Sequence, residues 1–201
     1  MRLALSGGRG AEVAVSGADP LAVLRDRRSR AALAAPAPPR SELQEILTAA
    51  CAAPDHARLR PWRFIVIEET AREALGDAFA AAQAEREPDA TPADLRRTRT
   101  KALRAPLIVV VVGTPRPHPK VPVWEQRASA ACAAYGVVLA AHVRGHGAMW
   151  RTGWYGEAPK VRAHLGLVDG EEVTGWVYLG TPVGPEPAPR PPVDPPITWL
   201  G

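Results

Sequence analysis

The sequence predicts one α+β domain. At 201 residues and 21.4 kDa, the chain is long enough to bury a sizeable core. Its hydrophobic fraction, 46%, is ordinary for a globular protein. Helical patterns with capping motifs alternate with short β-branched runs, of which 107–112 is the clearest. We therefore predict a flexible extension over 1–18, one domain over 19–182 and a Pro-rich arm over 183–201.

The N-terminal part begins without a clean period. Residues 1–18 mix Gly, Ser and Ala, and only 11–15 resembles a short strand. Asp19 and Pro20 form an N-cap and a favoured first-turn proline, which predicts a helix from Leu21 to about Arg28. Its apolar residues are expected to face inward: Leu21, Val23 and Leu24.

A second helix is predicted after the rigid proline connector at 35–39. Ser41 and Gln44 have the spacing of a capping box, and Pro54 stops the helix near Ala53. The residues expected on one buried face are Leu43, Ile46, Leu47, Ala50 and Cys51.

A polar loop follows Pro54 and leads into a strand that we expect to be buried over 62–67, with Pro61 at its start. The loop carries polar side chains able to hold a planar, oxygen-rich ligand: Asp55, His56, Arg58 and Arg60.

The middle of the chain predicts two helices and a central strand. Thr70 begins a capping box and a helix to about Ala84, and Thr91 caps a helix to about Leu103. The charges within 85–99 are typical of a solvated face. The run Leu107–Val112 predicts a strand covered on both faces.

The C-terminal half begins with a long Ala-rich helix, whose small residues permit close packing at a buried centre or an interface. Glycines 145 and 147 end it. The predicted elements are the helix Glu125–Arg144, a strand over 148–150, a small helix between Pro159 and Gly166, a strand over 172–179 and an extended arm over 185–196.

Bulk properties limit the function classes. No apolar run approaches the roughly 20 residues of a membrane span, and the first residues do not resemble a signal peptide, so we expect a cytoplasmic protein without a membrane partner. The pI is near 9.5, yet the net charge is only +4 and the 22 arginines are scattered. A nucleic-acid partner is therefore not expected. Cys51 and Cys132 are interpreted as small buried hydrophobes.

Common catalytic constellations are missing from the sequence. It contains neither a P-loop with its Lys-Ser/Thr pair nor a G-x-S-x-G elbow. His142 and His146 are spaced like a zinc pair, but Gly145 interrupts the helix and no third ligand is evident. No metal site is predicted.

Four motifs in order resemble the FMN-dependent nitroreductase family, and in particular its short NAD(P)H branch. Together they span roughly 19–182. The motifs are R-R-S at 27–29, A-P-D-H-x-x-x-x-P-W-R-F at 53–64, W-R-T-G at 150–153 and G-W-x-Y-L-G-T-P at 175–182.

The resemblance implies a mainly antiparallel central sheet flanked by helices, in a homodimer that exchanges its C-terminal arms and holds FMN at the subunit interface. NADH or NADPH would give hydride to flavin N5, which would pass it to a small conjugated or nitro-type acceptor in a ping-pong cycle. In such a family 85–99 often forms a substrate lid. FMN carries the chemistry, so no protein acid or base is required.

The motif positions also imply site residues. The FMN contacts implied are Arg27, Arg28, Ser29, His56, Arg60, Trp150, Arg151 and Thr152, with the Arg guanidinium suited to phosphate. The nicotinamide contacts implied are Ala140, Ala141, His142, Val143, Arg144 and Gly145.

Three positions depart from the family pattern. Ala31 stands where many relatives have a basic residue near the flavin N1 and O2 edge, Ala52 where the short branch often has Arg, and Arg60 where Gln is usual. These departures leave open a non-catalytic flavin- or ligand-binding protein. Within the same fold, dehydrogenation or flavin-consuming reduction of another conjugated substrate also stays open, as does, from another class, a basic nucleic-acid-binding domain.

Overall fold

The computed structural model describes residues 20–188, 190–191 and 193–201. The predicted strand at 11–15 and the predicted cap at Asp19 lie outside these residues. The helices are α1 Pro20–Asp26, α2 Arg40–Ala50, α3 Ala71–Arg86, α4 Pro92–Arg99, α5 Val123–Val143 and α6 Pro159–His164. The strands are β1 Leu33–Ala34, β2 Trp62–Glu68, β3 Leu107–Gly113, β4 Gly147–Arg151 and β5 Glu172–Pro182, and the 3-10 turns are η1 His56–Arg58, η2 Thr100–Leu103 and η3 Trp154–Gly156.

The five strands form one antiparallel sheet, as the family resemblance implied. Its order is β1-β5-β3-β2, and β4 also pairs with β5. β4 pairs with β5 over 176–180, and β1 pairs with it over 181–182, so both lie on the side of β5 opposite β3. Among the strands of the described residues, β4 pairs with β5 alone.

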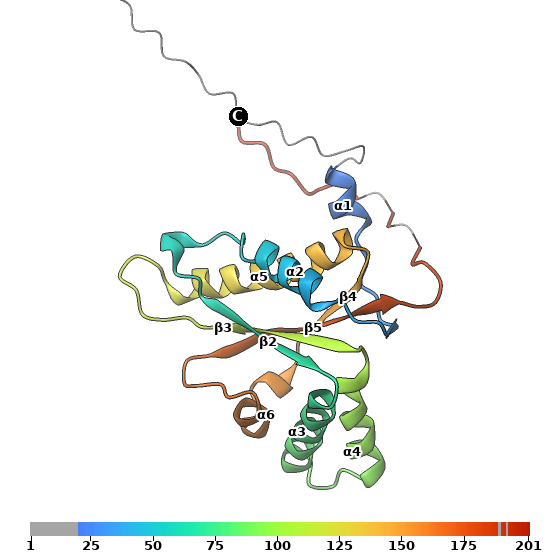
Figure 1. Cartoon of the computed structure of the whole chain (residues 1–201). Coiled ribbons are helices and arrows are strands. Elements are labelled where there is room, and N and C mark those ends of the chain that lie inside the picture. The colour runs from blue at the N-terminus through green and yellow to red at the C-terminus, as the bar shows by residue number, and fades with distance from the viewer. Residues whose placement is uncertain (1–19, 189, 192) are drawn as a thin grey trace, which may run out of the picture.

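Helices cover both faces of this sheet (Figure 1). The central strand β3 is buried throughout, which confirms the prediction for 107–112. Its alternate residues point to different layers, as the two-residue period of a strand requires. Ile108, Val110 and Val112 pack with α3 and α6, whereas Leu107, Val109 and Val111 pack with α2 and α5.

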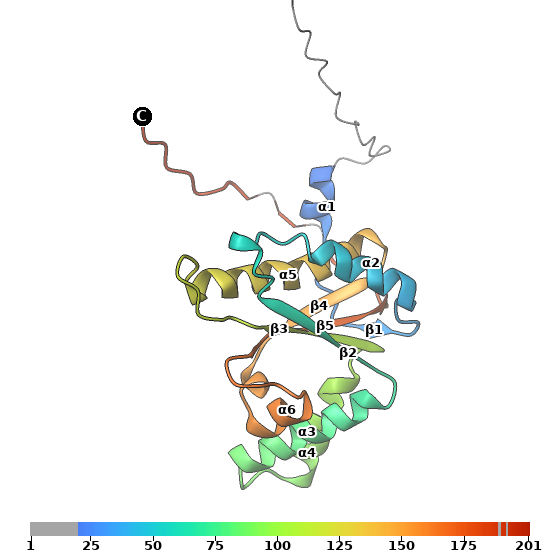
Figure 2. The same cartoon turned by 60° about the vertical axis from the view of Figure 1, so that its left-hand side comes forward.

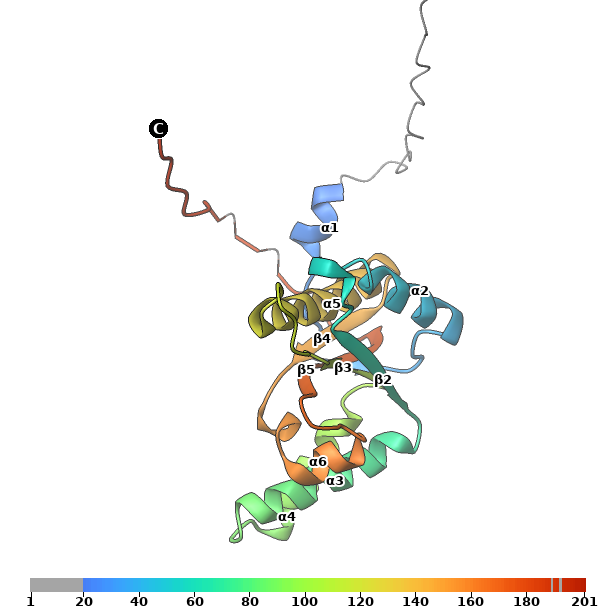
Figure 3. The same ribbon diagram turned by 90° about the vertical axis from the view of Figure 1, so that its left-hand side faces the viewer.

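The layer of α2 and α5 is closely packed. Turned views show α2 lying along α5 above the sheet, with α3, α4 and α6 gathered below it (Figures 2 and 3). A Cβ at Gly136 of α5 would lie 2.9 Å from the Cα of Ala50 in α2. Small residues therefore permit the close approach of these helices, as expected from the Ala-rich pattern.

The turn between α5 and β4 contains Gly145, one of the two glycines predicted to end the helix. Gly145 has φ +79°, and the backbone N–H of His146 donates to Ala141 O at 2.9 Å, which closes the helix with a left-handed cap. This sharp turn sends the chain back along β5 as β4.

Two burial predictions are wrong. Leu21 and Leu24 are 59% and 44% exposed, because α1 ends at Asp26 and projects from the upper layer instead of packing into it (Figure 1). Cys51 and Cys132 are also exposed: the first is the C-cap residue of α2, and the second lies on the outward side of α5.

Neither of the two predicted capping boxes forms, whereas the predicted cap at Thr91 does. Thr91 and Asp94 exchange both hydrogen bonds at the start of α4. Ser41 already lies inside α2, which starts at Arg40 after Pro39, and Thr70 has helical dihedral angles, so neither side chain caps its helix. The strand expected to be buried, β2, is a sheet edge with Val66 39% exposed. In the described part of the chain, no helix has the length and apolar character needed to cross a bilayer.

Candidate functional site

The first predicted ligand segment, 27–29, lies beside β4. It follows α1 without regular structure, and the next residue, Arg30, donates its backbone N–H to Ala148 O at 2.9 Å. This bond ties the segment to the strand that carries Trp150 and Arg151. Two motifs more than a hundred residues apart in sequence are therefore both attached to strand β4.

Arg28 lines a cavity of about 230 Å³ with His142, Gly145 and His146. Its Nη1 donates to Arg25 O at 2.6 Å, but its buried Nε has no acceptor among the described residues. A buried N–H without a partner is uncommon and calls for an explanation. An oxygen-bearing ligand in this cavity would supply the missing acceptor.

Arg30 is already engaged at the edge of the same cavity. Its guanidinium is buried and contacts Glu186 Oε2 at 2.7 Å, at the start of the arm. Arg30 is therefore not free to supply the positive charge that is missing at Ala31, which is exposed. The ion pair instead holds the first residues of the arm against the domain.

The loop after Pro54 is held in a strained shape by its own aspartate. The Asp55 carboxylate accepts the backbone N–H groups of Leu59 and Arg60, at 3.0 and 2.7 Å. Ala57, Arg58 and Arg60 all have positive φ, which non-glycine residues seldom adopt. Such strain is most common where a loop serves a ligand.

His56 is fixed to the beginning of α5. Its Nδ1 lies 2.8 Å from Glu125 Oε2 in the first turn of that helix, which favours the tautomer with a proton on Nδ1. The Arg60 guanidinium has no partner among the residues described. The loop therefore presents His56 and Arg60 near the N-terminal end of α5.

At the end of β4, Trp150 and Arg151 point to opposite faces of the sheet. Trp150 packs with the α2 and α5 layer and lies against Gly175, where a Cβ would collide with its indole Nε1. Arg151 points to the other layer, 5.9 Å from the centre of the Tyr178 ring. Thr152 follows and is exposed. The W-R-T-G and G-W-x-Y motifs thus depend on each other sterically.

One chain brings together only part of the predicted site. Segment 27–29 and residues 150–152 meet through β4, whereas His56 lies at the other end of α5 from His142. His142 is 17 positions after Glu125, a span of about 25 Å of helix. His56 and Arg28 therefore do not face a common cavity within one chain.

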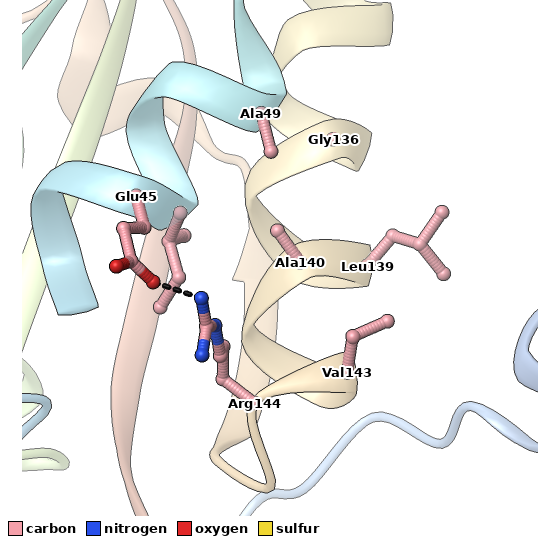
Figure 4. Close-up of a pocket in the computed structure, with 8 residues that line it drawn as sticks. Glu45, Ala49, Gly136, Leu139, Ala140, Val143 and Arg144 are labelled. Carbon is pink, nitrogen blue, oxygen red and sulfur yellow. Dashed lines mark hydrogen bonds and ion pairs between the residues drawn. The ribbon is translucent and has the colours of Figure 1, made fainter. Parts of the chain in front are cut away.

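The segment predicted to contact nicotinamide divides between surfaces. Ala141 is fully buried in the core, and His142 and Gly145 line the cavity beside Arg28. Ala140, Val143 and Arg144 line a pocket of about 320 Å³ between α2 and α5. In this pocket Glu45 and Arg144 form an ion pair (Figure 4). Figure 4 shows Leu139 and Val143 directed away from α2.

α5 presents an apolar row to the outside, which we call the outer α5 face. Trp124 is 67% exposed and Val143 is 64% exposed, at opposite ends of the helix. The row repeats at helical spacing and consists of Trp124, Ala128, Cys132, Tyr135, Leu139 and Val143. Contiguous apolar exposure of this kind is typical of an interaction surface.

Sequence reasoning missed the surroundings of Arg151. Its side chain lines a cavity of about 210 Å³ together with two other cations and two tyrosines, of which only Tyr178 belongs to a quoted motif. These residues are Lys101, Arg104, Tyr155 and Tyr178. Burial raises the pKa of the Tyr178 hydroxyl, while the charges of Arg104 and Arg151 oppose that rise. No sequence spacing links these residues, because tertiary packing alone brings them together.

The chain matches known proteins over most of its length. The model of the nitroreductase family matches residues 24–181. The chain is 40% identical over 164 residues to the Escherichia coli K12 protein named "Putative NAD(P)H nitroreductase YdjA", covering 82% of this chain and 88% of that one. It is 38% identical over 164 residues to a Haemophilus influenzae protein named "Putative NAD(P)H nitroreductase", covering 81% and 88%.

Solved structures share the fold. A nitroreductase-like family protein from Bacillus cereus superposes with a TM-score of 0.72 at 24% identity, covering 88% of this chain and 93% of that one. A nitroreductase with bound FMN from Bacteroides fragilis gives a TM-score of 0.69 at 26% identity, covering 90% and 98%. With its sheet order, its motif positions and these matches, this chain belongs to the nitroreductase family.

Proposed function

We propose that this chain is an FMN-dependent oxidoreductase that takes hydride from NADH or NADPH and passes it to a small conjugated or nitro-type acceptor. The observation that carries the proposal is the buried, unpartnered Arg28 Nε in a cavity joined to β4. The B. fragilis structure contains bound FMN, and the bacterial relatives are named NAD(P)H nitroreductases. Bound FMN would supply the hydride chemistry in two half-reactions.

The chain's own residues would bind and orient the flavin. Arg28 lines the cavity and Arg27 precedes it in the chain, and neither forms an ion pair in the described residues. A guanidinium in this state is well suited to a phosphate, which accepts paired N–H bonds. Ser29 adds a hydroxyl, and the free edge of β4 offers backbone groups near Arg151 and Thr152 for the polar rim of the ring.

A second copy of the chain would complete the site. The outer α5 face is apolar along its whole length and would be buried if two copies packed with their α5 helices antiparallel about a two-fold axis. That arrangement places the start of one α5, with His56 and Arg60, beside the end of the partner's α5, where Arg27 to Ser29 lie. The separation of about 25 Å within one chain would then be bridged between chains.

A non-catalytic flavin-binding protein is the second candidate. The observation that favours it is the pairing of Arg30 with Glu186, since no cation then replaces the missing one at Ala31. The flavin would be bound but its reduced form less well stabilised. Ala52 is also exposed and too short to contribute a charge.

The visible absorption spectrum of the purified full chain, before and after anaerobic addition of NADPH or NADH, tests the proposal. We expect flavin bands that bleach with at least one of the two donors. Bands that persist with both would favour the second candidate. A colourless protein that also fails to take up added FMN would contradict both.

A substitution at Arg28 is compared with the same substitution at an exposed arginine, Arg97, as the matched control. Arg28→Gln should weaken FMN affinity by about tenfold to a hundredfold, the usual range for losing one charge-assisted bond. Arg97→Gln removes an equal charge from an exposed site on α4, 77% of whose side chain is accessible. It should leave FMN affinity unchanged.

A further inference from the structure

The cavity around Arg151 lies on the face of the sheet covered by α3, α4 and α6, and we call it the cationic pocket. It measures about 210 Å³, and Thr152 at its rim connects it to the end of β4. Cavities of roughly 150 Å³ can accept benzene. The cationic pocket is therefore large enough for a single aromatic ring.

Three cations converge on this pocket without a carboxylate. Lys101 Nζ donates to the Tyr155 hydroxyl at 2.6 Å, and neither Arg104 nor Arg151 pairs with an acid in the described residues. Elsewhere arginines are commonly neutralised, as in the pairs Arg63–Glu171 and Arg127–Glu172. Like charges this close repel one another, and a bound anion would remove that cost.

The inner wall of the pocket is aromatic and well ordered by packing. Phe79, Trp176 and Tyr178 are at most 4% exposed. The Phe79 ring lies 4.7 Å from the Tyr155 ring and 5.2 Å, edge-on, from the Trp176 ring, measured between centroids. Such a wall is complementary to an aromatic ring rather than to a compact inorganic anion.

We propose that the cationic pocket binds the carboxylate of a small aromatic acid, and that the physiological acceptors are anionic aromatic compounds. Lys101, Arg104 and Arg151 would hold the carboxylate, with the Tyr178 hydroxyl as a further donor and the aromatic wall covering the ring. The Arg151 backbone also belongs to the predicted flavin edge, so the pocket would place the acceptor beside it. The substrate assignment rests on the proposed function; anion binding by the pocket does not.

Calorimetric titration with benzoate tests the pocket directly, with benzamide as a neutral probe of the same shape. The full chain should bind benzoate at least about tenfold more tightly than benzamide, since the ionic donors favour a carboxylate. Arg104→Gln and Lys101→Met should each weaken benzoate binding by about tenfold and leave benzamide binding unchanged. The control Arg97→Gln should change neither.

Repeating the titration with FMN-loaded protein distinguishes two sources of the anion. If the pocket serves an acceptor, benzoate binds in both forms. If FMN loading abolishes benzoate binding, the cations hold part of the flavin and the inference is overturned. Equal affinities for benzoate and benzamide, or no effect of Arg104→Gln and Lys101→Met, would also overturn it.

Steady-state reduction then tests the substrate class. The ratio of kcat/KM for 4-nitrobenzoate to that for 4-nitrobenzamide should fall about tenfold in Arg104→Gln, mainly through KM. An unchanged ratio would contradict the assignment even if benzoate binds. If no flavin reduction occurs at all, the proposed function fails, while the benzoate titration still decides whether the pocket binds anions.

Discussion

The two faces of the sheet are completed in different ways. On the α3, α4 and α6 face, the helices enclose an aromatic core built around Phe79 and Trp176, which borders the small cationic pocket. On the α2 and α5 face, the inner side of α5 is buried while its outer side exposes a continuous apolar row. The helices of one chain cover the α3, α4 and α6 face. The exposed apolar row on the α2 and α5 face resembles one side of a protein–protein interface.

The two faces also differ in which predicted site residues they carry. The predicted flavin residues belong mainly to the α5 side, where they lie at the two ends of one helix, and would become neighbours only through a second chain. Arg151 alone crosses to the opposite face, because successive residues of β4 alternate. We infer that one face serves assembly and flavin binding, and the other serves acceptor recognition.

A substitution on the outer α5 face tests whether this face forms an interface. Val143→Asp puts a charge into the proposed interface twice, once from each copy, which should cost association at least about 3 kcal/mol. Val168→Asp is the matched control, because Val168 is 63% exposed in the single chain and Val143 is 64% exposed. Sedimentation velocity should find Val143→Asp shifted to monomer and Val168→Asp unchanged. Equal behaviour of the two variants would contradict the assembly role.

A large effect on stability is expected at Gly175 of β5, against which the Trp150 indole of β4 packs. A side chain there collides with the Trp150 indole, so Gly175→Val should destabilise the fold by about 3 kcal/mol. For a chain of this size that corresponds to a fall in Tm of about 6–12 °C. Trp150→Ala should recover part of the loss in the double variant, and full additivity of the two substitutions would refute the contact.

A smaller effect on stability is expected from the ion pair between Arg63 and Glu171. Arg63 in β2 grips Glu171 with two bonds of 2.7 Å, which hold the pKa of that carboxyl below its usual value. The resulting stability is present at neutral pH and is lost as the pH falls through the lowered pKa. Glu171→Gln should cost about 1–2 kcal/mol at pH 7 and progressively less at lower pH in urea titrations. A pH-independent difference would exclude this linkage.

Local signals in the sequence predicted much of the fold. The β-branched run at 107–112 can hardly be anything but a central strand, and the glycine at 145 ends α5 as expected. The family and the antiparallel sheet, which followed from four ordered motifs, are confirmed. Capping motifs were less dependable, since Ser41 lies inside α2, and Thr70, although it is the N-cap residue of α3, has helical dihedral angles.

What the sequence missed depends on contacts between distant segments. Leu21 and Leu24 are apolar at helical spacing, yet α1 projects outward, and burial of Cys132 as a small hydrophobe fails because its side of α5 faces away from the core. The cationic pocket combines residues from η2, β4 and β5, and the two-residue strand β1 has no pattern of its own. The roles of the predicted site residues stay predictions.

Mixing two defective variants tests whether each flavin is held by two chains. One carries Arg27→Gln and Arg28→Gln, and the other carries His56→Gln and Arg60→Gln. With different affinity tags, the mixed dimer can be isolated and its FMN content measured. We predict that neither variant alone retains FMN, whereas the mixed dimer has one intact site and retains a single FMN for each pair of chains. A mixed dimer without FMN would contradict the account, because a site built within one chain would be defective in both subunits.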